Sequence, residues 1–258
     1  MDGEAWRGIR QAAADRRSGA AQIVRRAAEA LAALPNHDVE EAVLTLIRGQ
    51  PSMAPLWRLG SEVLGSADHA GTARDFALRV ASEGDRVANR AASLLGDPVV
   101  VHSFSSTVIA AVAASGARAI CARSEPGGEG EATVKRLSDL GVEARLAEDM
   151  EAVEAITEAG AVAVGADAVG PGGVVNKVRT RTLAEAARRA GTACLVLAGD
   201  SKLLEADVPA PDPFERTPLD LFTSVVTERG SLSPIEAAVL GRKRPIHLRL
   251  AALLRELR

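Results

Sequence analysis

Apolar and alanine residues recur with the period of an α-helix over the first part of the chain. The period is clear from Ile9 to Leu34, and Ser18 with the residues that follow it resembles a helix-capping box. No convincing strand pattern precedes residue 97. The pattern therefore predicts an all-helical N-terminal domain, residues 1–95, with further helices over about 38–50, 52–66 and 69–94.

After residue 96 the pattern changes to short apolar runs that alternate with helical stretches. This alternation is typical of a parallel, doubly wound sheet, so we predict an α/β chain in which a Rossmann-like parallel-sheet domain covers 96–258. The segment 208–218 is interpreted as an ordered loop or linker before a last structural unit. The predicted strands are 98–102, 117–122, 142–146, 161–166 and 193–198, and the predicted helices between them are 105–115, 130–140, 149–158 and 180–190.

Ligand crevices in such sheets form beyond the carboxyl ends of the strands, so the residues after each apolar run are the candidate site. The clearest segment is AVGADAVGPGGVVNKVRTRT, in which an apolar run ends at Asp167, a glycine-rich turn follows, and Asn176-Lys177 are expected to open a helix. An acid followed closely by an amide and an ammonium group favours a polyol or sugar-phosphate site. The other segments predicted at this edge are 102–103, 123–130 and 199–202.

Two side chains of the clearest segment each allow two interpretations. Asp167 can serve as a general base or bind a substrate hydroxyl, or it can be a helix N-cap or turn aspartate. Lys177, beside Asn176, can reach an anion that the free N–H groups of the next helix also attract. A solvated surface lysine is the alternative for Lys177.

Three further positions are candidates for binding phosphate. Ser103 lies at the first strand-to-helix turn, where hydroxyl and backbone N–H groups can bind phosphate, although a serine N-cap without ligand fits equally. Arg123 begins a glycine-rich loop and can bind an anion, or the loop is a plain turn. Arg17 and Gly19, just before a helix, can hold a second phosphate, but exposed arginines before helices are common.

Charge and composition narrow the possible partners. The chain has 31 Lys+Arg against 34 Asp+Glu and a formal net charge of −3, so no global positive field indicates direct binding of nucleic acid or of an anionic membrane. The first residues lack an apolar signal core, and no apolar run approaches the roughly 20 residues that a membrane span needs. These features predict a cytoplasmic protein.

The chain lacks the sequence motifs that usually indicate a metal site, a nucleotide cofactor site or a serine nucleophile. It contains no Gly-x-Ser-x-Gly elbow, no Walker lysine pattern and no dinucleotide fingerprint. Cys121 and Cys194 lie inside predicted strands without metal-ligand spacing, so we expect both to be buried, reduced thiols. We therefore predict no metal and no cofactor.

Several segments, in order along nearly the whole chain, resemble the initiation factor 2B alpha/beta/delta subunit family. Its superfamily also holds methylthioribose-1-phosphate isomerase and ribose-1,5-bisphosphate isomerase. The block from Gly165 to Lys177, with its GAD and NK motifs, is the most specific part of the resemblance. The matching segments are DRRSGAAQIVRRAAEAL (15–31), VVVHSFSSTV (99–108), RSEPGGEG (123–130), GADAVGPGGVVNKVRTRTLAEAA (165–187), DSK (200–202) and TPLDLFTSVVTERGSLSP (217–234).

The resemblance implies a sugar-phosphate pocket at the strand ends and dimers or higher homo-oligomers formed through the C-terminal domain. In the isomerases a cysteine and the aspartate of the GAD motif interconvert an aldose 1-phosphate and a ketose 1-phosphate. Asp167 matches that aspartate, and Asn176-Lys177 match the adjacent polar pair. Lys202, in the DSK segment, is expected to help to hold the ligand.

Three departures put isomerase activity in doubt. Ser103 stands where the isomerases carry the catalytic cysteine, and a serine hydroxyl is a much weaker acid than a thiol, whose pKa is about 8.5. Glu125 stands where the family has a phosphate-binding arginine, which is displaced here to Arg123. Arg179 replaces a usual glycine and either blocks the pocket or supplies the missing cation.

Three hypotheses follow from these observations. The first is a protein that binds a sugar phosphate or a related phosphorylated metabolite, with isomerase chemistry lost or altered. The second is an active aldose-ketose sugar-phosphate isomerase, an intramolecular oxidoreductase, with Asp167 as the base and Ser103 or water as the proton donor. The third is an interaction protein of translation initiation that resembles the regulatory subunits.

Overall fold

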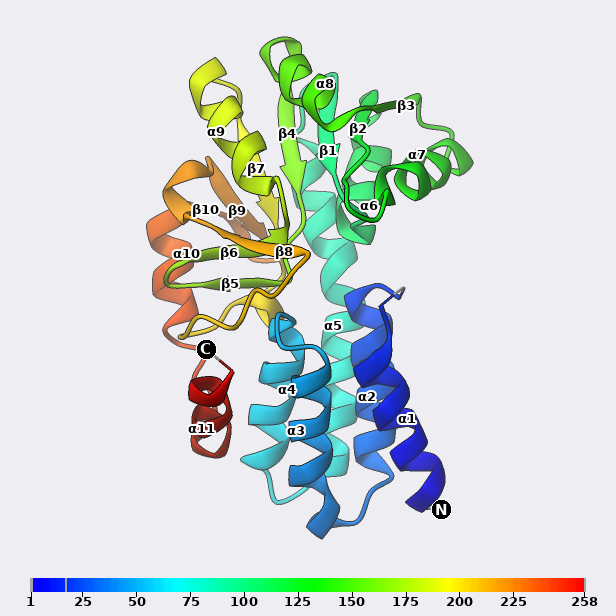
Figure 1. The fold of residues 1–258 in the computed structure, drawn as a ribbon, viewed down its shortest axis with the longest axis vertical. Helices are drawn as coiled ribbons and strands as arrows, with labels where there is room; N and C mark the ends of the chain where they lie inside the picture. The colour runs from blue at the N-terminus through cyan, green and yellow to red at the C-terminus, as the bar shows by residue number, and fades with distance from the viewer. Residues whose placement is uncertain (1, 17, 258) are drawn as a thin grey trace.

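The N-terminal part of the protein is a bundle of helices. The computed structural model describes residues 2–16 and 18–257, and Figure 1 shows this bundle below a separate α/β layer. The bundle packs large apolar side chains, among them Ile23, Leu46 and Trp57, into one buried core, which confirms the helical region expected from the sequence. Its helices are α1 (Asp2–Ala14), α2 (Ala20–Ala32), α3 (Val39–Gly49), α4 (Ala54–Leu64) and α5 (His69–Ala92), with a short 3₁₀ turn η1 (Asn36–Asp38).

The turn between α1 and α2 differs from the predicted capping box. Gly19, not Ser18, precedes the first turn of α2, and no side chain caps that helix. The Gly19 carbonyl instead accepts the N–H groups of Gln22 and Ile23 at 3.0 and 3.2 Å. The backbone N–H of Ser18 donates to Asp15 Oδ1 at 2.9 Å, so the serine belongs to the preceding turn.

The C-terminal part is built on a seven-stranded sheet. Its strand order is β10-β9-β7-β4-β1-β2-β3, and only the β9–β10 pair is antiparallel. The five predicted apolar runs form the five strands from β7 to β3, which confirms a mostly parallel α/β sheet. The strands are β1 (Val99–His102), β2 (Ala119–Ala122), β3 (Ala144–Ala147), β4 (Ala161–Val164), β7 (Cys194–Leu197), β9 (Ser224–Thr227) and β10 (Gly230–Leu232).

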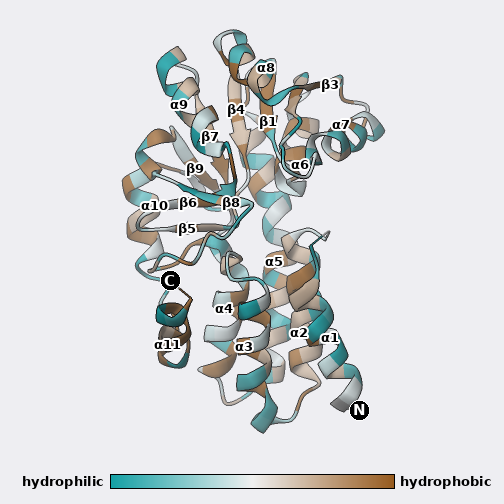
Figure 2. Ribbon diagram, viewed as in Figure 1, coloured by the Kyte–Doolittle hydropathy of each residue, from teal (hydrophilic) through white to brown (hydrophobic). Residues whose placement is uncertain are grey.

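Helices cover both faces of this sheet, because the central strands are apolar on both sides. Val99 and Val101 of β1 face a core shared with the end of α5 and with α6 and α7, whereas Val100 faces α8, α9 and α10. Figure 2 shows the hydrophobic residues concentrated on the central strands. The helices are α6 (Ser106–Ser115), α7 (Glu129–Asp139), α8 (Asp149–Glu154), α9 (Thr180–Ala190) and α10 (Pro234–Gly241), with short 3₁₀ turns η2 (Ala155–Glu158), η3 (Asp200–Lys202) and η4 (Leu219–Leu221).

A second, three-stranded antiparallel sheet lies beside the large one and was not expected. It consists of β5 (Ala168–Gly170), β6 (Gly173–Lys177) and β8 (Phe214–Thr217), in the order β5-β6-β8. The prediction that Asn176-Lys177 open a helix is therefore wrong, because both residues end β6 and α9 begins at Thr180. The glycine-rich turn makes a hairpin, and part of the predicted 208–218 loop pairs with it.

The last helix, α11 (Leu248–Glu256), returns to the helical bundle. Leu250, Leu253 and Leu254 join the bundle core, so the C-terminus of the chain packs against its N-terminal region. No helix within residues 2–16 and 18–257 is long and apolar enough to cross a membrane.

Candidate functional site

Asp167 lies between β4 and β5, at the carboxyl edge of the large sheet, and its backbone is fixed from two sides. Its N–H donates to Val175 O of the small sheet at 2.8 Å, and its carbonyl accepts the N–H of Ala54, at the start of α4, at 3.0 Å. Its partly buried carboxylate makes no hydrogen bond or ion pair with any residue that the structure describes. Burial raises the pKa of Asp167 to about 6, although the positive charge of Lys202 opposes the rise.

Lys202 is the partner that the fold brings to Asp167. It ends the η3 turn that follows β7, the strand next to β4 in the sheet. Burial lowers the pKa of Lys202, and the negative charges of Asp167 and Glu83 oppose this effect. In the described part of the chain, no acceptor bonds to its Nζ and no carboxylate oxygen lies within 4.0 Å of it. An acid and a base are therefore electrostatically coupled, and no described residue binds the polar atoms of either side chain.

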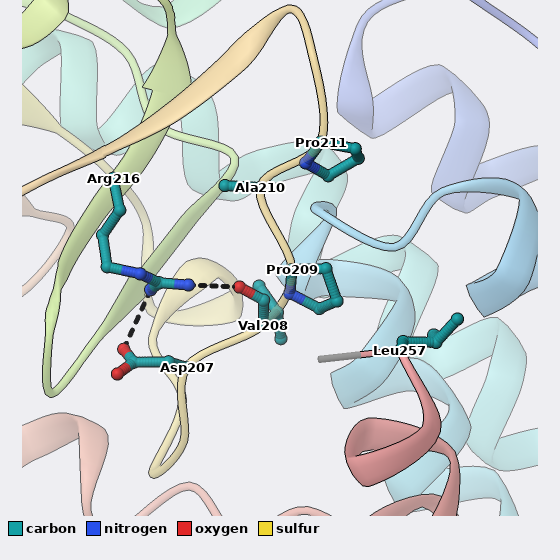
Figure 3. Close-up of a pocket in the computed structure, with 7 residues that line it drawn as sticks. All are labelled: Asp207, Val208, Pro209, Ala210, Pro211, Arg216 and Leu257. Carbon is teal, nitrogen blue, oxygen red and sulfur yellow. Dashed lines mark hydrogen bonds and ion pairs between the residues drawn. The ribbon is translucent and has the colours of Figure 1, made fainter.

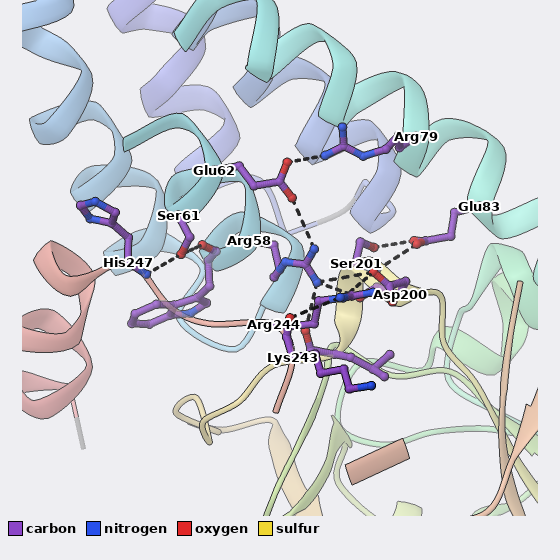
Figure 4. Close-up of polar contacts among 12 residues, drawn as sticks. Arg58, Ser61, Glu62, Arg79, Glu83, Asp200, Ser201, Lys243, Arg244 and His247 are labelled. Atoms are coloured by element: carbon purple, nitrogen blue, oxygen red, sulfur yellow. Dashed lines mark hydrogen bonds and ion pairs between the residues drawn. The ribbon is translucent and has the colours of Figure 1, made fainter. Parts of the chain in front are cut away.

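The η3 turn that carries Lys202 is held from both parts of the molecule (Figure 4). The Glu83 carboxylate of α5 accepts the backbone N–H of Ser201 at 2.9 Å and its hydroxyl at 2.5 Å. Arg244 donates to both carboxylate oxygens of Asp200, at 2.7 and 2.9 Å. The backbone N–H of the third residue, Lys202, donates to Gly199 O at 3.0 Å, so the backbone of the whole turn is fixed.

Gly199, just before this turn, allows Glu83 to approach closely enough to form these hydrogen bonds. A Cβ added to Gly199 would lie 2.1 Å from the carboxyl carbon of Glu83, which is far closer than such atoms approach in proteins. Glu83 is only 8% exposed, and burial raises the pKa of its carboxyl, against the hydrogen bonds from Ser201. Glu83 had no signal in the sequence, because a single acid in a helical pattern usually marks a solvated face.

The loop after β1 places Ser103 close to the other strand ends. Ser103 has a positive φ of 61°, and its N–H donates to Ser124 Oγ, in the loop after β2, at 2.7 Å. A Cβ on Gly165 would lie 2.8 Å from Ser105 Oγ, so the glycine lets the loops after β1 and β4 meet. The Ser103 hydroxyl makes no hydrogen bond to another described residue.

His102 is fixed in a neutral form beneath these loops. Its Nε2 lies 2.9 Å from Val178 O, and its Nδ1 lies 3.0 Å from Ser124 Oγ. Burial lowers the pKa of His102, so the ring is neutral near pH 7, with the Nε2 proton on the side of the carbonyl. His102 therefore organises the strand ends and is not available as a proton donor to a ligand.

Arg123, predicted to bind an anion, is already paired with two carboxylates. It donates to Glu148 Oε1 at 2.8 Å and to Glu131 Oε1 at 2.7 Å. Both glutamates are 67% exposed, so the three charges form a surface network. Arg179 has a similar arrangement, with a guanidinium nitrogen 3.3 Å from Asp149 Oδ2.

Lys177 is likewise occupied by its own chain. Its Nζ donates to Glu129 Oε1 at 2.5 Å and to the carbonyl of Pro126, and its side chain is only 4% exposed. The amide of Asn176, its neighbour, donates to Thr180 Oγ1 at 3.0 Å and thus supports the first turn of α9. Both residues are buried, which excludes the alternative of a solvated surface lysine for Lys177.

The N-terminal candidates lie at the turn between α1 and α2. Figure 1 shows this turn at the end of the bundle that faces the α/β layer. Arg17 lies outside the described residues. The Gly19 carbonyl caps α2, and a Cβ at Gly19 would meet no atom within 4 Å. The side chain of Arg16 donates to the carbonyls of Ala13 and Gly49, each at 2.8 Å, and thereby ties the turn to α3.

Two cavities lie away from the pair formed by Asp167 and Lys202. One, of about 370 Å³, is the groove drawn in Figure 3, where Arg216 pairs with Asp207 beneath the proline-rich segment. The other, of about 210 Å³, lies at the carboxyl edge between α8 and α9. Sequence reasoning missed this second cavity and the acid in it; its lining residues are His102, Ala122, Asp149, Met150, Val153, Arg179, Thr182 and Leu183.

The predicted site residues thus fall into two groups. Asp167, Lys202 and Ser103 have polar atoms that no described residue satisfies, whereas Arg123 and Lys177 are neutralised by acids of the chain itself. The available group combines a carboxylate, an ammonium and a hydroxyl. Such a set can bind a polyol and can exchange a proton at a carbon next to a carbonyl.

Comparison with known proteins identifies the family. Residues 20–209 match the initiation factor 2 subunit family (IF-2B), and the protein belongs to that family. A ribose 1,5-bisphosphate isomerase of Haloferax volcanii is 31% identical over 182 residues, which span 57% of this chain and 56% of that enzyme. A ribose 1,5-bisphosphate isomerase of Archaeoglobus fulgidus is 26% identical over a gapped alignment of 277 positions, which covers 88% of each chain.

Solved structures share the fold. The translation initiation factor eIF-2B of Pyrococcus horikoshii OT3 aligns with a TM-score of 0.77 at 24% identity, over 90% of this chain and 97% of that one. The tetrameric eIF2B-beta2-delta2 complex of C. thermophilum gives 0.75 at 18% identity, over 94% of each chain. The 5-methylthioribose 1-phosphate isomerase of Pyrococcus horikoshii OT3 gives 0.67 at 17% identity, over 98% of this chain and 88% of that one.

Proposed function

We propose that the protein binds a sugar phosphate or a related phosphorylated metabolite at the carboxyl edge of its sheet. Asp167 and Lys202 hold the polyol part, and Ser103 contributes a hydroxyl. The observation that carries the proposal is the pair Asp167 and Lys202, whose polar atoms are electrostatically coupled but satisfied by no described residue. Two relatives named as ribose 1,5-bisphosphate isomerases support this ligand class. In this proposal the protein works in the cytosol without metal or cofactor.

A thermal-shift titration tests the proposal. Ribose 5-phosphate, ribose 1,5-bisphosphate and methylthioribose 1-phosphate are added to the wild type and to Lys202→Met. A ligand at one hundred times its Kd stabilises the folded protein by about 2.7 kcal/mol, which raises Tm by several degrees. We expect this shift in the wild type and its loss in Lys202→Met. Lys243→Met, at an exposed lysine, is the matched control and should keep the shift.

The absence of a shift with all three phosphates would refute the proposal. It would favour the alternative of an interaction protein of translation initiation, which co-purification of a GTPase with the protein would support. An equal shift in wild type and Lys202→Met would place the ligand away from the pair.

A second candidate function is isomerisation of the bound sugar phosphate. The specific observation in its favour is the pKa of Asp167, about 6, since a carboxylate with this pKa is a suitable general base near neutral pH. The replacement of cysteine by Ser103 in the resemblance argues for a slow or altered reaction. Turnover of ribose 1,5-bisphosphate that disappears in Asp167→Asn, while ligand binding remains, would establish the activity; no turnover in the wild type leaves binding alone.

We also propose that the protein forms a homodimer or a higher homo-oligomer through its α/β part. Ile235 and Val239, one turn apart on α10, are 77% and 46% exposed, an apolar pair of the kind found at interfaces. Light scattering should give at least twice the monomer mass of 26.8 kDa, and Ile235→Glu should reduce it. A monomer at all concentrations would refute this part.

A further inference from the structure

The ion pair between Lys177 and Glu129 occupies a position at which a ligand is otherwise expected. Lys177 ends β6 and Glu129 begins α7, so the pair joins the small sheet to the loop after β2. The Nζ–Oε1 distance is 2.5 Å, and the lysine side chain is 4% exposed. A buried ammonium in direct contact with a carboxylate carries no net charge toward a third group.

The loop is shaped around this pair. Gly127, with a φ of 120°, passes so close that an added Cβ would lie 2.8 Å from Glu129 Oε1 and 3.0 Å from Lys177 Nζ. The carbonyl of Pro126 accepts a further hydrogen bond from the same ammonium. Glu129 is also the first residue of α7, where the helix N-terminus favours a negative charge. Three features of one loop therefore hold the carboxylate on the lysine.

One oxygen of the pair lacks a partner. Glu129 Oε2 is buried and makes no hydrogen bond to any described residue. A buried carboxylate oxygen without a donor is costly, so a group that donates a hydrogen bond is favoured there. An approaching phosphate carries between one and two negative charges at neutral pH, so the carboxylate repels it, whereas an uncharged hydroxyl can donate without this repulsion.

We infer that Glu129 determines specificity by acting as a built-in counter-anion: it excludes phosphate from Lys177 and selects an uncharged, hydroxyl-bearing part of the ligand. This inference rests on the proposed function and refines it, because the phosphate must then bind elsewhere in the site. The negative charge of Glu129 reduces the affinity for anions at Lys177.

Calorimetric titration with inorganic phosphate at constant ionic strength tests the inference. Glu129→Gln keeps the size of the side chain and removes its charge, so Lys177 becomes available to an anion. We expect the variant to bind phosphate at least about tenfold more tightly than the wild type, since a charge-assisted bond of this kind is gained. The gain should disappear in the double variant Glu129→Gln/Lys177→Met.

Glu125→Gln is the matched control. It removes the same charge from the same loop, but Glu125 bonds to the N–H of Gly127 and not to Lys177. An equal gain in this variant, or no gain in Glu129→Gln, would overturn the inference. Near-ultraviolet circular dichroism establishes that each variant is folded.

A measurement on the unchanged protein keeps the test independent of folding. The chain has only four lysines, Lys135, Lys177, Lys202 and Lys243, so their side-chain NMR signals can be resolved and assigned by substitution. We expect ribose 5-phosphate to move the Lys202 signal and inorganic phosphate to leave the Lys177 signal unchanged. A change in the chemical shift of the Lys177 signal on addition of inorganic phosphate would contradict the inference. An unchanged Lys202 signal on addition of sugar phosphates would contradict the proposed function alone.

Discussion

Lys177 ends β6 of the small sheet and Lys202 follows β7 of the large one, and the two lysines differ in what surrounds them. Lys177 contacts a carboxylate at 2.5 Å, whereas Lys202 interacts electrostatically with Asp167 and Glu83 but has no carboxylate oxygen within 4.0 Å among the described residues. The charge of Lys177 is neutralised by its own chain, whereas the ammonium of Lys202 remains available to a ligand. The difference teaches that a lysine in a recognisable motif is not a ligand-binding group until its neighbours are known.

Substitution of the two lysines should affect stability very differently. Lys177→Met leaves Glu129 partly buried without its partner and should lower the free energy of unfolding by about 2–3 kcal/mol. Lys202→Met removes a partly buried charge that lacks a direct partner, so stability should stay within about 1 kcal/mol of the wild type or rise. Urea unfolding measures both values. Equal decreases in the free energy of unfolding of the two variants would contradict the proposed difference between the two lysines.

The acid beside Lys202 should give the stability a particular pH dependence. The pKa of Asp167 is raised from 3.8 to about 6, so the folded protein binds this proton more tightly than the unfolded chain does. Relative to Asp167→Asn, the wild type should therefore lose about 2 kcal/mol as the pH rises from about 4 to about 6, and the difference should become constant above about pH 7. Thermal or urea unfolding at several pH values measures it. A wild type that gains stability over this range would contradict the raised pKa.

Glu83 should influence Lys202 through its charge and through the turn. Glu83→Gln removes a negative charge that opposes the lowered pKa of Lys202, so the pKa of that lysine should fall further. NMR titration of the lysine side chains measures the change, with Lys177 as an internal reference. A merely structural role for Glu83 predicts lower stability with an unchanged Lys202 titration.

The smallest effect is expected at Arg123. Its two glutamate partners are 67% exposed, so Arg123→Ala should cost less than about 1 kcal/mol of stability. The ligand-induced thermal shift should also be retained, because the guanidinium is bound to acids of its own chain. Loss of the shift in this variant would show that Arg123 binds the ligand. It would contradict the distinction between cations that are neutralised by the chain and cations that are available to a ligand.

Much of the architecture could be predicted, because the apolar runs in the sequence mark the buried strands of the large sheet. Each run from 98–102 to 193–198 became a strand. Four of these strands, β1, β2, β4 and β7, are buried at every position and are therefore apolar almost throughout, whereas the edge strand β3 is partly exposed. The small sheet was missed, because β5 and β6 are short and lie within a glycine-rich segment and β8 contains two adjacent charged residues. Its pairing depends on contact between residues 174–177 and 214–217, which local patterns do not reveal.

The sequence by itself determined the helical N-terminal region, the five parallel strands from β1 to β7 that it predicted, the membership of a family, and the set of polar residues at the strand ends. Tertiary structure alone decided which of those residues are available. Glu129 lies 48 residues before Lys177, and Glu83 lies 118 residues before Ser201. Periodicity depends on neighbours along the chain, but neutralisation of a charge depends on distance in space, and that distance exists only once the chain has folded.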